Sequence, residues 1–202
     1  MKELVFATHN EHKAREIRAI LSQEYRILSL DDVGFQDPVP ENENSLEGNA
    51  SQKAWYVHNR LGKDCFADDT GLEVACLNGA PGVYSARYAD LTGEREVDEP
   101  ASEANIRKLL AQMQGESNRK AQFRTIISLI LEGKEYIFEA MVEGVILEGR
   151  KGAGGFGYDP VFLPSGYTNT FADMSLEQKN IISHRALAVL KLVTFLKKYR
   201  PK

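Results

Sequence analysis

The organisation of the chain depends on one stretch, Phe66-Ala67-Asp68-Asp69-Thr70-Gly71-Leu72. An apolar run ends there in two adjacent carboxylates, a hydroxyl and a glycine, and a second apolar run begins directly at Leu72. This pattern predicts a buried strand whose end or kink carries two acids into a cleft. Two neighbouring carboxylates are costly to bury unpaired, and a divalent cation with phosphate oxygens would relieve that cost. The alternative is an acidic turn between two strands, because Asp, Thr and Gly are common turn residues.

The composition is that of a globular protein of one domain. The chain has 202 residues, of which 43% are hydrophobic and 27% charged, so it can bury a substantial core. Its net charge of -4 gives no general attraction to nucleic acid or to an anionic membrane, and no apolar run approaches the roughly 18 residues that span a bilayer. We therefore expect neither nucleic acid nor a membrane as a partner.

The N-terminus and the cysteines predict a cytoplasmic protein. The chain runs almost at once into a strand-like segment, and no secretory leader is recognisable. Cys65 and Cys76 both lie in apolar surroundings. We expect them to be reduced core residues rather than the two halves of a disulfide.

The first strand and helix predict a candidate phosphate site. Residues 4–7 are typical of a short buried strand, and Thr8-His9-Asn10 lead into a helix with apolar positions at helical spacing. Asn10 is a plausible N-cap, and Lys13 falls in the first helical turn. Backbone N–H groups and an ammonium would then point to one place, which suits a phosphate without the Walker glycines. The alternative is a capped helix with a solvated lysine.

A second helix is predicted after an acidic loop, residues 34–44, that contains Glu41. Asn44-Ser45-Leu46-Glu47 resembles a capping box, and Gly62 marks the end of the helix after Leu61. One edge of this helix carries polar residues at every fourth position: Ser45, Asn49 and Lys53. Such an edge usually faces solvent.

The second half of the chain predicts a long hairpin and two further helices. Residues 122–131 and 134–146 alternate like strands and are joined at Glu132-Gly133. Residues 104–113 form an amphipathic pattern, and we assign no function to the acidic segment 90–99 that precedes it. The final helix is expected to turn one apolar stripe inward: Leu187, Leu190, Val193 and Leu196.

Two further segments indicate ligand contacts. The glycine-rich stretch 149–160 would allow close approach of its backbone to a ligand, with the ring of Phe156 available for stacking, although a flexible hairpin connection is the alternative. Ser183 is a plausible N-cap, which puts His184 and Arg185 at a helix N-terminus. An unpaired cation is disfavoured there. An electron-rich ligand group would explain the placement, and so would a structural bond to a neighbouring loop.

Together, the polar residues comprise acids suited to a metal, lysines suited to a polyphosphate, and an aromatic ring with cations suited to a base. The motifs that contain them are similar to those of one family, the non-standard purine nucleoside triphosphate pyrophosphatases (inosine/xanthosine triphosphatases). The matching motifs are Thr8-His9-Asn10-Glu11-His12-Lys13, Gly48-Asn49-Ala50 with Lys53, Ala67-Asp68-Asp69-Thr70-Gly71-Leu72, Pro81-Gly82-Val83-Tyr84-Ser85-Ala86-Arg87-Tyr88, Gly155-Phe156-Gly157-Tyr158-Asp159-Pro160, and Phe171-Ala172-Asp173-Met174-Ser175 with Lys179-Asn180 and Ser183-His184-Arg185.

This resemblance implies a fold, a reaction and partners. The fold would be α/β, a single pyrophosphatase domain over residues 1–202 whose two lobes flank a long mixed sheet, with the active-site cleft between them. The reaction would be hydrolysis of ITP, dITP or XTP to the monophosphate and pyrophosphate, which cleanses the nucleotide pool. Mg²⁺ would be the cofactor, and the protein would be a homodimer.

The resemblance also assigns roles to single residues. Asp69 would accept the proton, and Asp68 would share that role or the metal; the metal ligands would be Glu41 and Asp69. Lys13 and Lys53 would neutralise the triphosphate, and Phe156 would stack on the base while Lys179, His184 and Arg185 donate to its 6-oxo group. The remaining expected substrate contacts are Thr8, His9, Asn10, Glu11, His12, Asn49, Thr70, Gly157, Tyr158 and Asp159.

Two alternatives stay open on the sequence alone. One is a related pyrophosphatase that acts on pyrimidine or other modified nucleotides, and that family lacks the pairing of Ser-His-Arg with Gly-Phe-Gly-Tyr-Asp found here. The other is a catalytically silent nucleotide-binding regulator. The acids Glu41, Asp68 and Asp69 argue against the regulator, because a binding module has no need of a proton acceptor.

Overall fold

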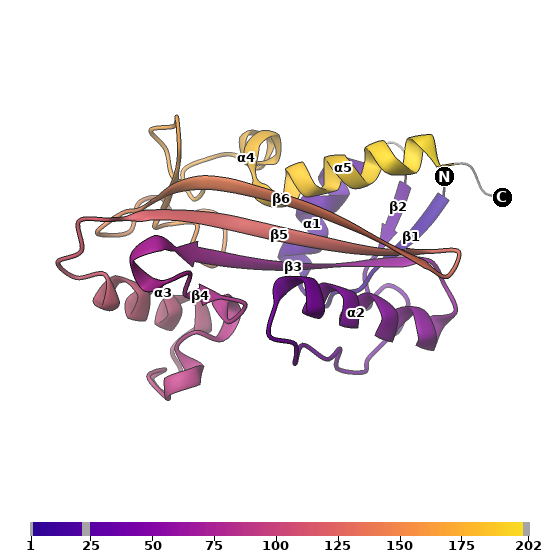
Figure 1. Cartoon of the computed structure of the whole chain (residues 1–202), viewed down its shortest axis with the longest axis horizontal. Helices are drawn as coiled ribbons and strands as arrows, with labels where there is room; N and C mark the ends of the chain where they lie inside the picture. The colour runs from indigo at the N-terminus through magenta and orange to yellow at the C-terminus, as the bar shows by residue number, and fades with distance from the viewer. Residues whose placement is uncertain (1, 22–24, 200–202) are drawn as a thin grey trace. The chain divides into compact units, whose positions relative to one another are not determined.

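The computed structural model describes residues 2–21 and 25–199, which form a mixed sheet with flanking helices (Figure 1). The helices are α1 (Glu11–Leu21), α2 (Leu46–Leu61), α3 (Ala101–Gln112), α4 (Leu176–Ile182) and α5 (His184–Lys198), with 3-10 turns at Ala75–Leu77, Ser85–Arg87 and Asp90–Thr92. The strands are β1 (Lys2–Phe6), β2 (Tyr25–Leu28), β3 (Cys65–Val74), β4 (Pro81–Gly82), β5 (Lys120–Leu131), β6 (Lys134–Ile146) and β7 (Phe162–Pro164).

The sheet has the order β2-β1-β3-β5-β6-β7, with β4 paired to β3. Strand β1 runs parallel to both β2 and β3, whereas β4 is antiparallel to β3 and β7 is antiparallel to β6. The predicted α/β class with a mixed sheet is confirmed. The predicted hairpin is also present, and its turn residues Glu132 and Gly133 have φ values of 51° and 72°, which is typical of a two-residue type I′ turn.

The chain divides into two compact units. The first unit comprises Met1–Asp69, Thr125–Ala140 and Asn180–Lys202, and the second comprises Thr70–Arg124 and Met141–Lys179. Strands β3, β5 and β6 contribute residues to both units. The cleft expected between two lobes stays a prediction.

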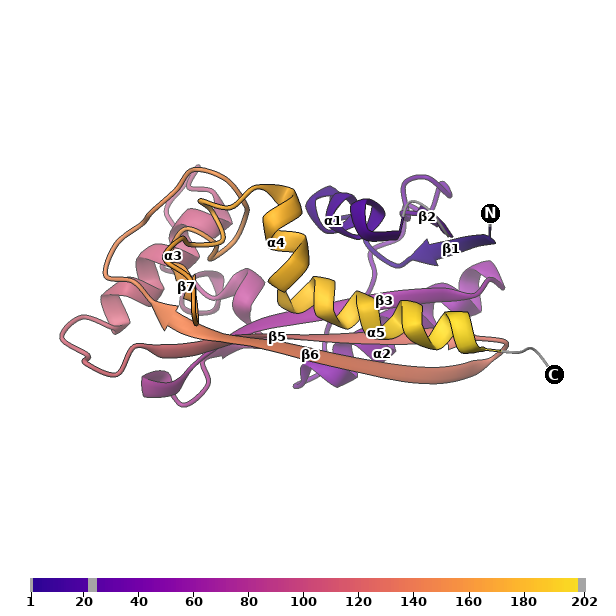
Figure 2. The same ribbon diagram turned by 90° about the horizontal axis from the view of Figure 1, so that it is seen from above.

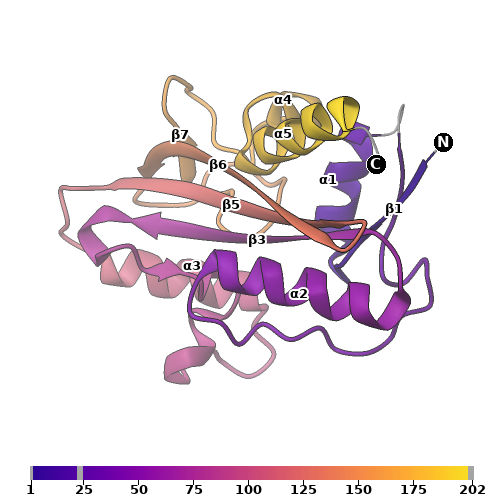
Figure 3. The same cartoon turned by 45° about the vertical axis from the view of Figure 1, so that its right-hand side comes forward.

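In the first unit, helices cover both faces of the strands (Figures 1 and 3). Helices α1 and α5 pack on the face that contains Phe6 and Phe66, whose stacked rings have centroids 4.6 Å apart. Helix α2 packs on the opposite face, against Val5 and Ala67. Consecutive residues of β3 therefore point alternately to α1 and α5 or to α2.

In the second unit, the long connection that leaves β6 includes β7 (Figure 2), and two of its phenylalanines belong to an aromatic core. Phe123 and Phe171 both contact the ring of Phe162, with centroids 4.7 and 5.3 Å away. Helix α3 holds the segment 81–89 through Asn105, whose amide group donates to the carbonyl oxygens of Ser85 and Ala86 and accepts from the N–H of Ala89. This unit is thus stabilised by buried polar contacts as well as by apolar packing.

Three local predictions need correction. Strand β3 continues from Cys65 to Val74, so Asp68 and Asp69 lie in its interior and form neither a turn nor a strand end. The N-cap of α2 is Ser45, whose hydroxyl accepts from the N–H of Gly48; because that third helical position is a glycine, no side chain can return the bond as in a capping box. In α5, Leu190 is 57% exposed, and the helix buries Ala188 and Val189 instead.

The sequence predicts neither a disulfide nor a membrane-spanning helix. Both cysteines are free thiols; Cys65 is buried as expected, whereas Cys76 is only half-buried and is not a core residue. Among residues 2–21 and 25–199, no helix combines the length and the hydropathy needed to cross a membrane.

Candidate active site

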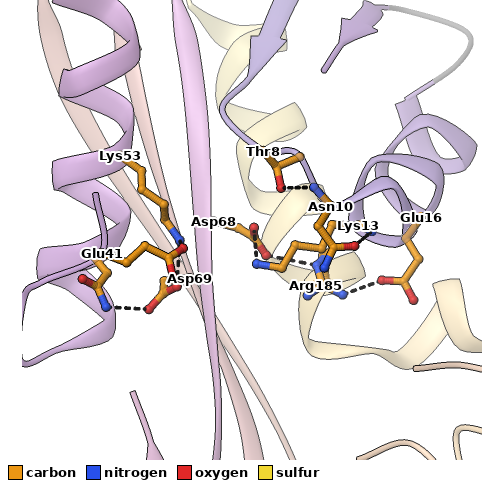
Figure 4. Close-up of polar contacts among 10 residues, drawn as sticks. Thr8, Asn10, Lys13, Glu16, Glu41, Lys53, Asp68, Asp69 and Arg185 are labelled. Atoms are coloured by element: carbon orange, nitrogen blue, oxygen red, sulfur yellow. Dashed lines mark hydrogen bonds and ion pairs between the residues drawn. The ribbon is translucent and has the colours of Figure 1, made fainter. Parts of the chain in front are cut away.

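Asp68 and Asp69 point to opposite faces of β3 (Figure 4). Asp68 lies on the same face as Phe66, beneath α1 and α5, and Asp69 lies on the same face as Ala67, beside α2. Asp68 is 2% exposed and Asp69 is 7% exposed, so both are buried. Each therefore requires its own cation.

Asp68 belongs to a chain of alternating charges. Its carboxylate accepts from the Nζ of Lys13 at 2.8 Å and from the Nε of Arg185 at 3.1 Å, and the Nη1 of Arg185 contacts the carboxylate of Glu16. Burial alone would raise the pKa of Asp68, but Lys13 and Arg185 outweigh it and hold that pKa well below its ordinary value. Asp68 is therefore ionised at any physiological pH.

Asp69 belongs to a second cluster, with Lys53, Asn49 and Glu41. The Nζ of Lys53 lies 2.8 Å from Asp69 Oδ1 and 2.6 Å from Glu41 Oε1, and the amide nitrogen of Asn49 donates to Asp69 Oδ2 at 3.3 Å. Burial raises the pKa of Asp69 above its ordinary value, and the opposing attraction of Lys53 and Lys13 does not cancel that rise. Asp69 is thus the more basic of the two carboxylates.

The ammonium of Lys53 stays charged in this cluster. Burial would lower its pKa, but Asp69 and Glu41 attract the proton and the net shift is upward. Burial would likewise raise the pKa of Glu41, and Lys53 reverses that effect. The cluster therefore holds a cation and an acidic oxygen pair at one place in the first unit.

The stretch from Thr8 to Lys13 divides into two sets. Asn10 caps α1 as predicted, because its side-chain oxygen accepts from the N–H of Lys13, and the hydroxyl of Thr8 accepts from the N–H of Asn10. The ammonium of Lys13, in the helical turn that Asn10 caps, contacts Asp68 (Figure 4). The other three side chains contact groups outside the cluster: His9 meets Asp31, Glu11 meets Arg18, and His12 meets Arg15.

The N-terminus of α5 has the predicted serine cap, and its first two residues are buried. Ser183 caps the helix by accepting from the N–H of Ala186, and both His184 and Arg185 are buried. A cation is disfavoured at a helix N-terminus. The two carboxylates of Asp68 and Glu16 offset that cost for Arg185. Its expected ligand contact stays a prediction.

In the second unit, Phe156, Asp159 and Lys179 form a third polar cluster. The Nζ of Lys179 lies 2.6 Å from Asp159 Oδ2 and 4.8 Å from the centre of the Phe156 ring. The same carboxylate oxygen accepts from the N–H of Phe156. Lys179 and Asp159 are both buried, so the ammonium is held directly against an aromatic face.

The glycines of this segment allow the chain to pack against itself. A Cβ at Gly155, whose φ is 71°, would lie 2.2 Å from the carboxylate of Asp159, and one at Gly152 would lie 2.7 Å from the backbone of Ala172. At Gly157, by contrast, a Cβ would meet nothing within 4 Å. The hydroxyl of Tyr158 donates to the carbonyl of Ser85, and burial raises its pKa above the ordinary value.

Glu16 was absent from the sequence-based set, although the structure places it in the Asp68 cluster. The sequence contains only a weak indication of this role: Glu16 follows Lys13 by three residues, so the two share one face of a helix. Thr70 follows Asp69 within β3, where the second unit begins.

The carboxylates of Glu41 and Asp69 could supply only some of the ligands that a magnesium ion needs. Among the described residues, no group of three or more His, Cys, Asp or Glu side chains is arranged to hold a metal. Glu41 and Asp69 nevertheless converge on one ammonium, and Mg²⁺ is commonly bound by one or two carboxylates together with substrate phosphates and water. A magnesium ion held by these two carboxylates would need further oxygen ligands from substrate phosphates and water.

Known proteins resemble this chain along almost its entire length. A dITP/XTP pyrophosphatase of Porphyromonas gingivalis is 51% identical over 97% of this chain and 98% of its own length, and one of Christiangramia forsetii is 48% identical over 97% and 100%. The solved Staphylococcus aureus Ham1 protein matches with a TM-score of 0.83 at 38% identity, over 97% of this chain and 98% of its own, and a Coxiella burnetii HAM1 protein matches with 0.85 at 32%, over 98% and 100%. The Ham1 family model matches residues 4–195, and the chain belongs to the Ham1 family.

Proposed function

We propose that this protein hydrolyses non-standard purine nucleoside triphosphates, namely dITP, ITP and XTP, to the monophosphate and pyrophosphate. Relatives about half identical over nearly the full length bear the name dITP/XTP pyrophosphatase. The observation that carries the proposal is the pair of clusters on β3, in which Asp68 and Asp69 each hold a lysine from a different helix. Cleansing of the nucleotide pool is the corresponding cellular role.

The two lysines would neutralise the triphosphate while one carboxylate moves a proton. Cleavage adds water to a phosphorus atom of the α–β anhydride and breaks that P–O bond, so pyrophosphate leaves and one proton must be accepted. Asp69 would take the proton, since its pKa is raised toward the working range of a base. Asp68 would stay ionised and orient Lys13 toward the phosphates.

A magnesium ion is part of the proposal. Glu41 and Asp69 would hold it, and when bound it would neutralise charge on the phosphate oxygens and acidify water. Lys53 bridges the same two carboxylates, so it would shift toward the phosphates as the ion binds.

Recognition of the base would depend on donors. Phe156 offers a ring for stacking, and the ammonium of Lys179 beside it can only donate. A donor suits the 6-oxo group of hypoxanthine or xanthine and opposes the 6-amino group of adenine, a buried mismatch that excludes substrates strongly. We also propose His184 and Arg185 as hydrogen-bond donors to the base, because the family resemblance assigns them that role.

The homodimer and the cytoplasmic location expected from the sequence are also proposals. Sedimentation of the purified protein tests the first, and fractionation of the source cells tests the second. A monomer at all concentrations, or recovery outside the cytoplasm, would contradict them.

A substrate panel tests the proposed reaction. Pyrophosphate release should be fast from dITP, ITP and XTP with Mg²⁺, and at least about 100-fold slower from dATP, given the size of hydrogen-bond mismatches. Asp69→Asn should lower kcat by about 100-fold or more while the circular dichroism spectrum stays unchanged, because a general base contributes about 10²–10⁴ in rate. Near-normal turnover by that variant would remove Asp69 as the base.

A further inference from the structure

We propose that Asn49 is a positioning residue, which ties the loop carrying Glu41 to Asp69, and that it does not contact substrate. The inference rests on the proposed function, because it assigns Glu41 and Asp69 their roles there. Asn49 was expected among the substrate contacts. It is 1% exposed, and both ends of its side-chain amide contact protein groups.

The two ends of that amide join separate parts of the first unit. The oxygen accepts from the backbone N–H of Glu43 at 3.0 Å, and the nitrogen donates to Asp69 Oδ2 at 3.3 Å. One side chain on α2 thus connects the loop before the helix to the middle of β3. Such second contacts fix the orientation of a ligating carboxylate.

The loop is held on α2 at neighbouring points as well. The side chain of Gln52 accepts from the N–H of Asn42 at 3.0 Å. A Cβ at Gly48 would lie 2.7 Å from the Cβ of Glu43, so the loop approaches the helix closely at that position. Both residues that follow Glu41 are therefore anchored to the helix.

Asn49 and Lys53 act as a pair one helical turn apart. Lys53 contacts Asp69 Oδ1 and Asn49 contacts Asp69 Oδ2, so each carboxylate oxygen has its own donor. Lys53 also contacts Glu41, while Asn49 contacts the backbone two residues further on. The separation of the two acids is thus set by α2, before any metal or nucleotide binds.

Two substitutions separate the two bonds. Asn49→Asp has the same shape and keeps an acceptor for the Glu43 N–H, but it lacks the donor and places a second carboxylate beside Asp69. Asn49→Leu removes both bonds at similar volume. Gln52→Leu is the matched control, because it removes one loop anchor and leaves Asp69 untouched.

Amide hydrogen exchange, followed by NMR without metal or nucleotide, tests the loop contact. In Asn49→Leu, the Glu43 amide should exchange about 2- to 10-fold faster, as expected for the loss of one hydrogen bond. In Asn49→Asp it should stay protected, and Gln52→Leu should accelerate Asn42 alone. An unchanged Glu43 amide in Asn49→Leu would overturn the proposal.

Kinetics with dITP test the coupling to Asp69. Both Asn49 variants should lower kcat by about 10- to 100-fold and raise the Mg²⁺ concentration for half-maximal rate, as removal of such partners does elsewhere. Asn49→Leu should leave the KM for dITP at saturating Mg²⁺ essentially unchanged, and Gln52→Leu should have the smaller effect on kcat. A raised KM with normal kcat in Asn49→Leu would show a substrate contact and overturn the proposal.

The two arms keep the proposals distinguishable. If the wild-type protein releases no pyrophosphate from dITP, the proposed function fails, and the exchange experiment alone decides whether Asn49 anchors the loop. If the wild-type protein is active and the exchange rates agree with the prediction, but kcat stays normal in both Asn49 variants, then Asn49 does not position Asp69 for catalysis.

Discussion

At the scale of single residues, two consecutive aspartates acquire different chemistry from their neighbours. Asp68 faces Lys13 and Arg185, which hold its pKa low, whereas burial raises the pKa of Asp69 despite Lys53. The alternation of side chains along β3 separates them. Under the proposed function, Asp68 would orient the cations and Asp69 would accept the proton.

Arg185 is expected to be essential for stability as well as for recognition. Arg185→Ala leaves the buried carboxylates of Glu16 and Asp68 with one fewer cation, so we expect the free energy of unfolding to fall by about 3–5 kcal/mol. Urea denaturation at pH 7 measures it. A change below about 1 kcal/mol, the size expected for a surface pair, would contradict the buried network.

Local sequence patterns predicted the helix caps, but they did not predict which distant residues contact one another. The caps at Asn10 and Ser183 follow from spacing and are present. The contact of Lys13 with Asp68 joins residues 55 apart and that of Arg185 with Asp68 joins residues 117 apart, so no local pattern contains either. Motif resemblance brought these residues together, but it did not reveal Glu16.

At the scale of elements, α2 determines how the Asp69 cluster is built. The helix begins at the Ser45 cap and ends at Gly62, whose φ of 62° is the left-handed conformation that glycine adopts readily. Between them, Asn49 and Lys53 are buried rather than solvent-facing. A polar helix edge usually lies in water, but this one is buried against Asp69 and the loop that contains Glu41 and Glu43.

Removal of the α2 cap should weaken the helix without changing the chemistry. Ser45→Ala should lower the free energy of unfolding by about 1 kcal/mol, because the Gly48 N–H loses its acceptor. Thermal unfolding by circular dichroism measures the effect, and Ser45→Asp should restore most of the stability. Equal stability of the alanine variant would mean that this cap does not contribute.

Helix α5 shows why an element can be predicted while its buried face is not. The leucine pattern predicted that Leu190 points inward, yet it is 57% exposed. Helices α1 and α5 pack against each other, and the fully buried alanines Ala14 and Ala188 lie in the same core cluster. Close helix contacts favour small side chains, which hydrophobicity alone ranks below leucine.

At the scale of the whole molecule, the buried charges predict how stability depends on pH. Asp68 has a lower pKa in the folded than in the unfolded state, so its contribution to the free energy of unfolding is present above the ordinary carboxyl value of about 4 and is lost as the pH falls from there toward the lower folded-state pKa. Asp69 has a higher pKa in the folded than in the unfolded state, so its pH dependence is reversed. Its contribution to the free energy of unfolding is present at low pH and is lost as the pH rises through the raised folded-state pKa.

Asp68→Asn should therefore flatten the loss of stability in acid, and Asp69→Asn should steepen it. The free energy of unfolding, measured in urea at intervals from pH 3 to pH 7, gives the slope for each variant. Identical slopes for the wild-type protein and Asp68→Asn would show that Asp68 is not the carboxylate whose charge the folded state requires.

The products of dITP test the central claim most directly. Phosphorus NMR of a reaction with Mg²⁺ should show only the monophosphate and pyrophosphate appearing together, since cleavage falls between the α- and β-phosphates. Appearance of the diphosphate with orthophosphate, or no turnover of dITP by the wild-type protein, would contradict the account.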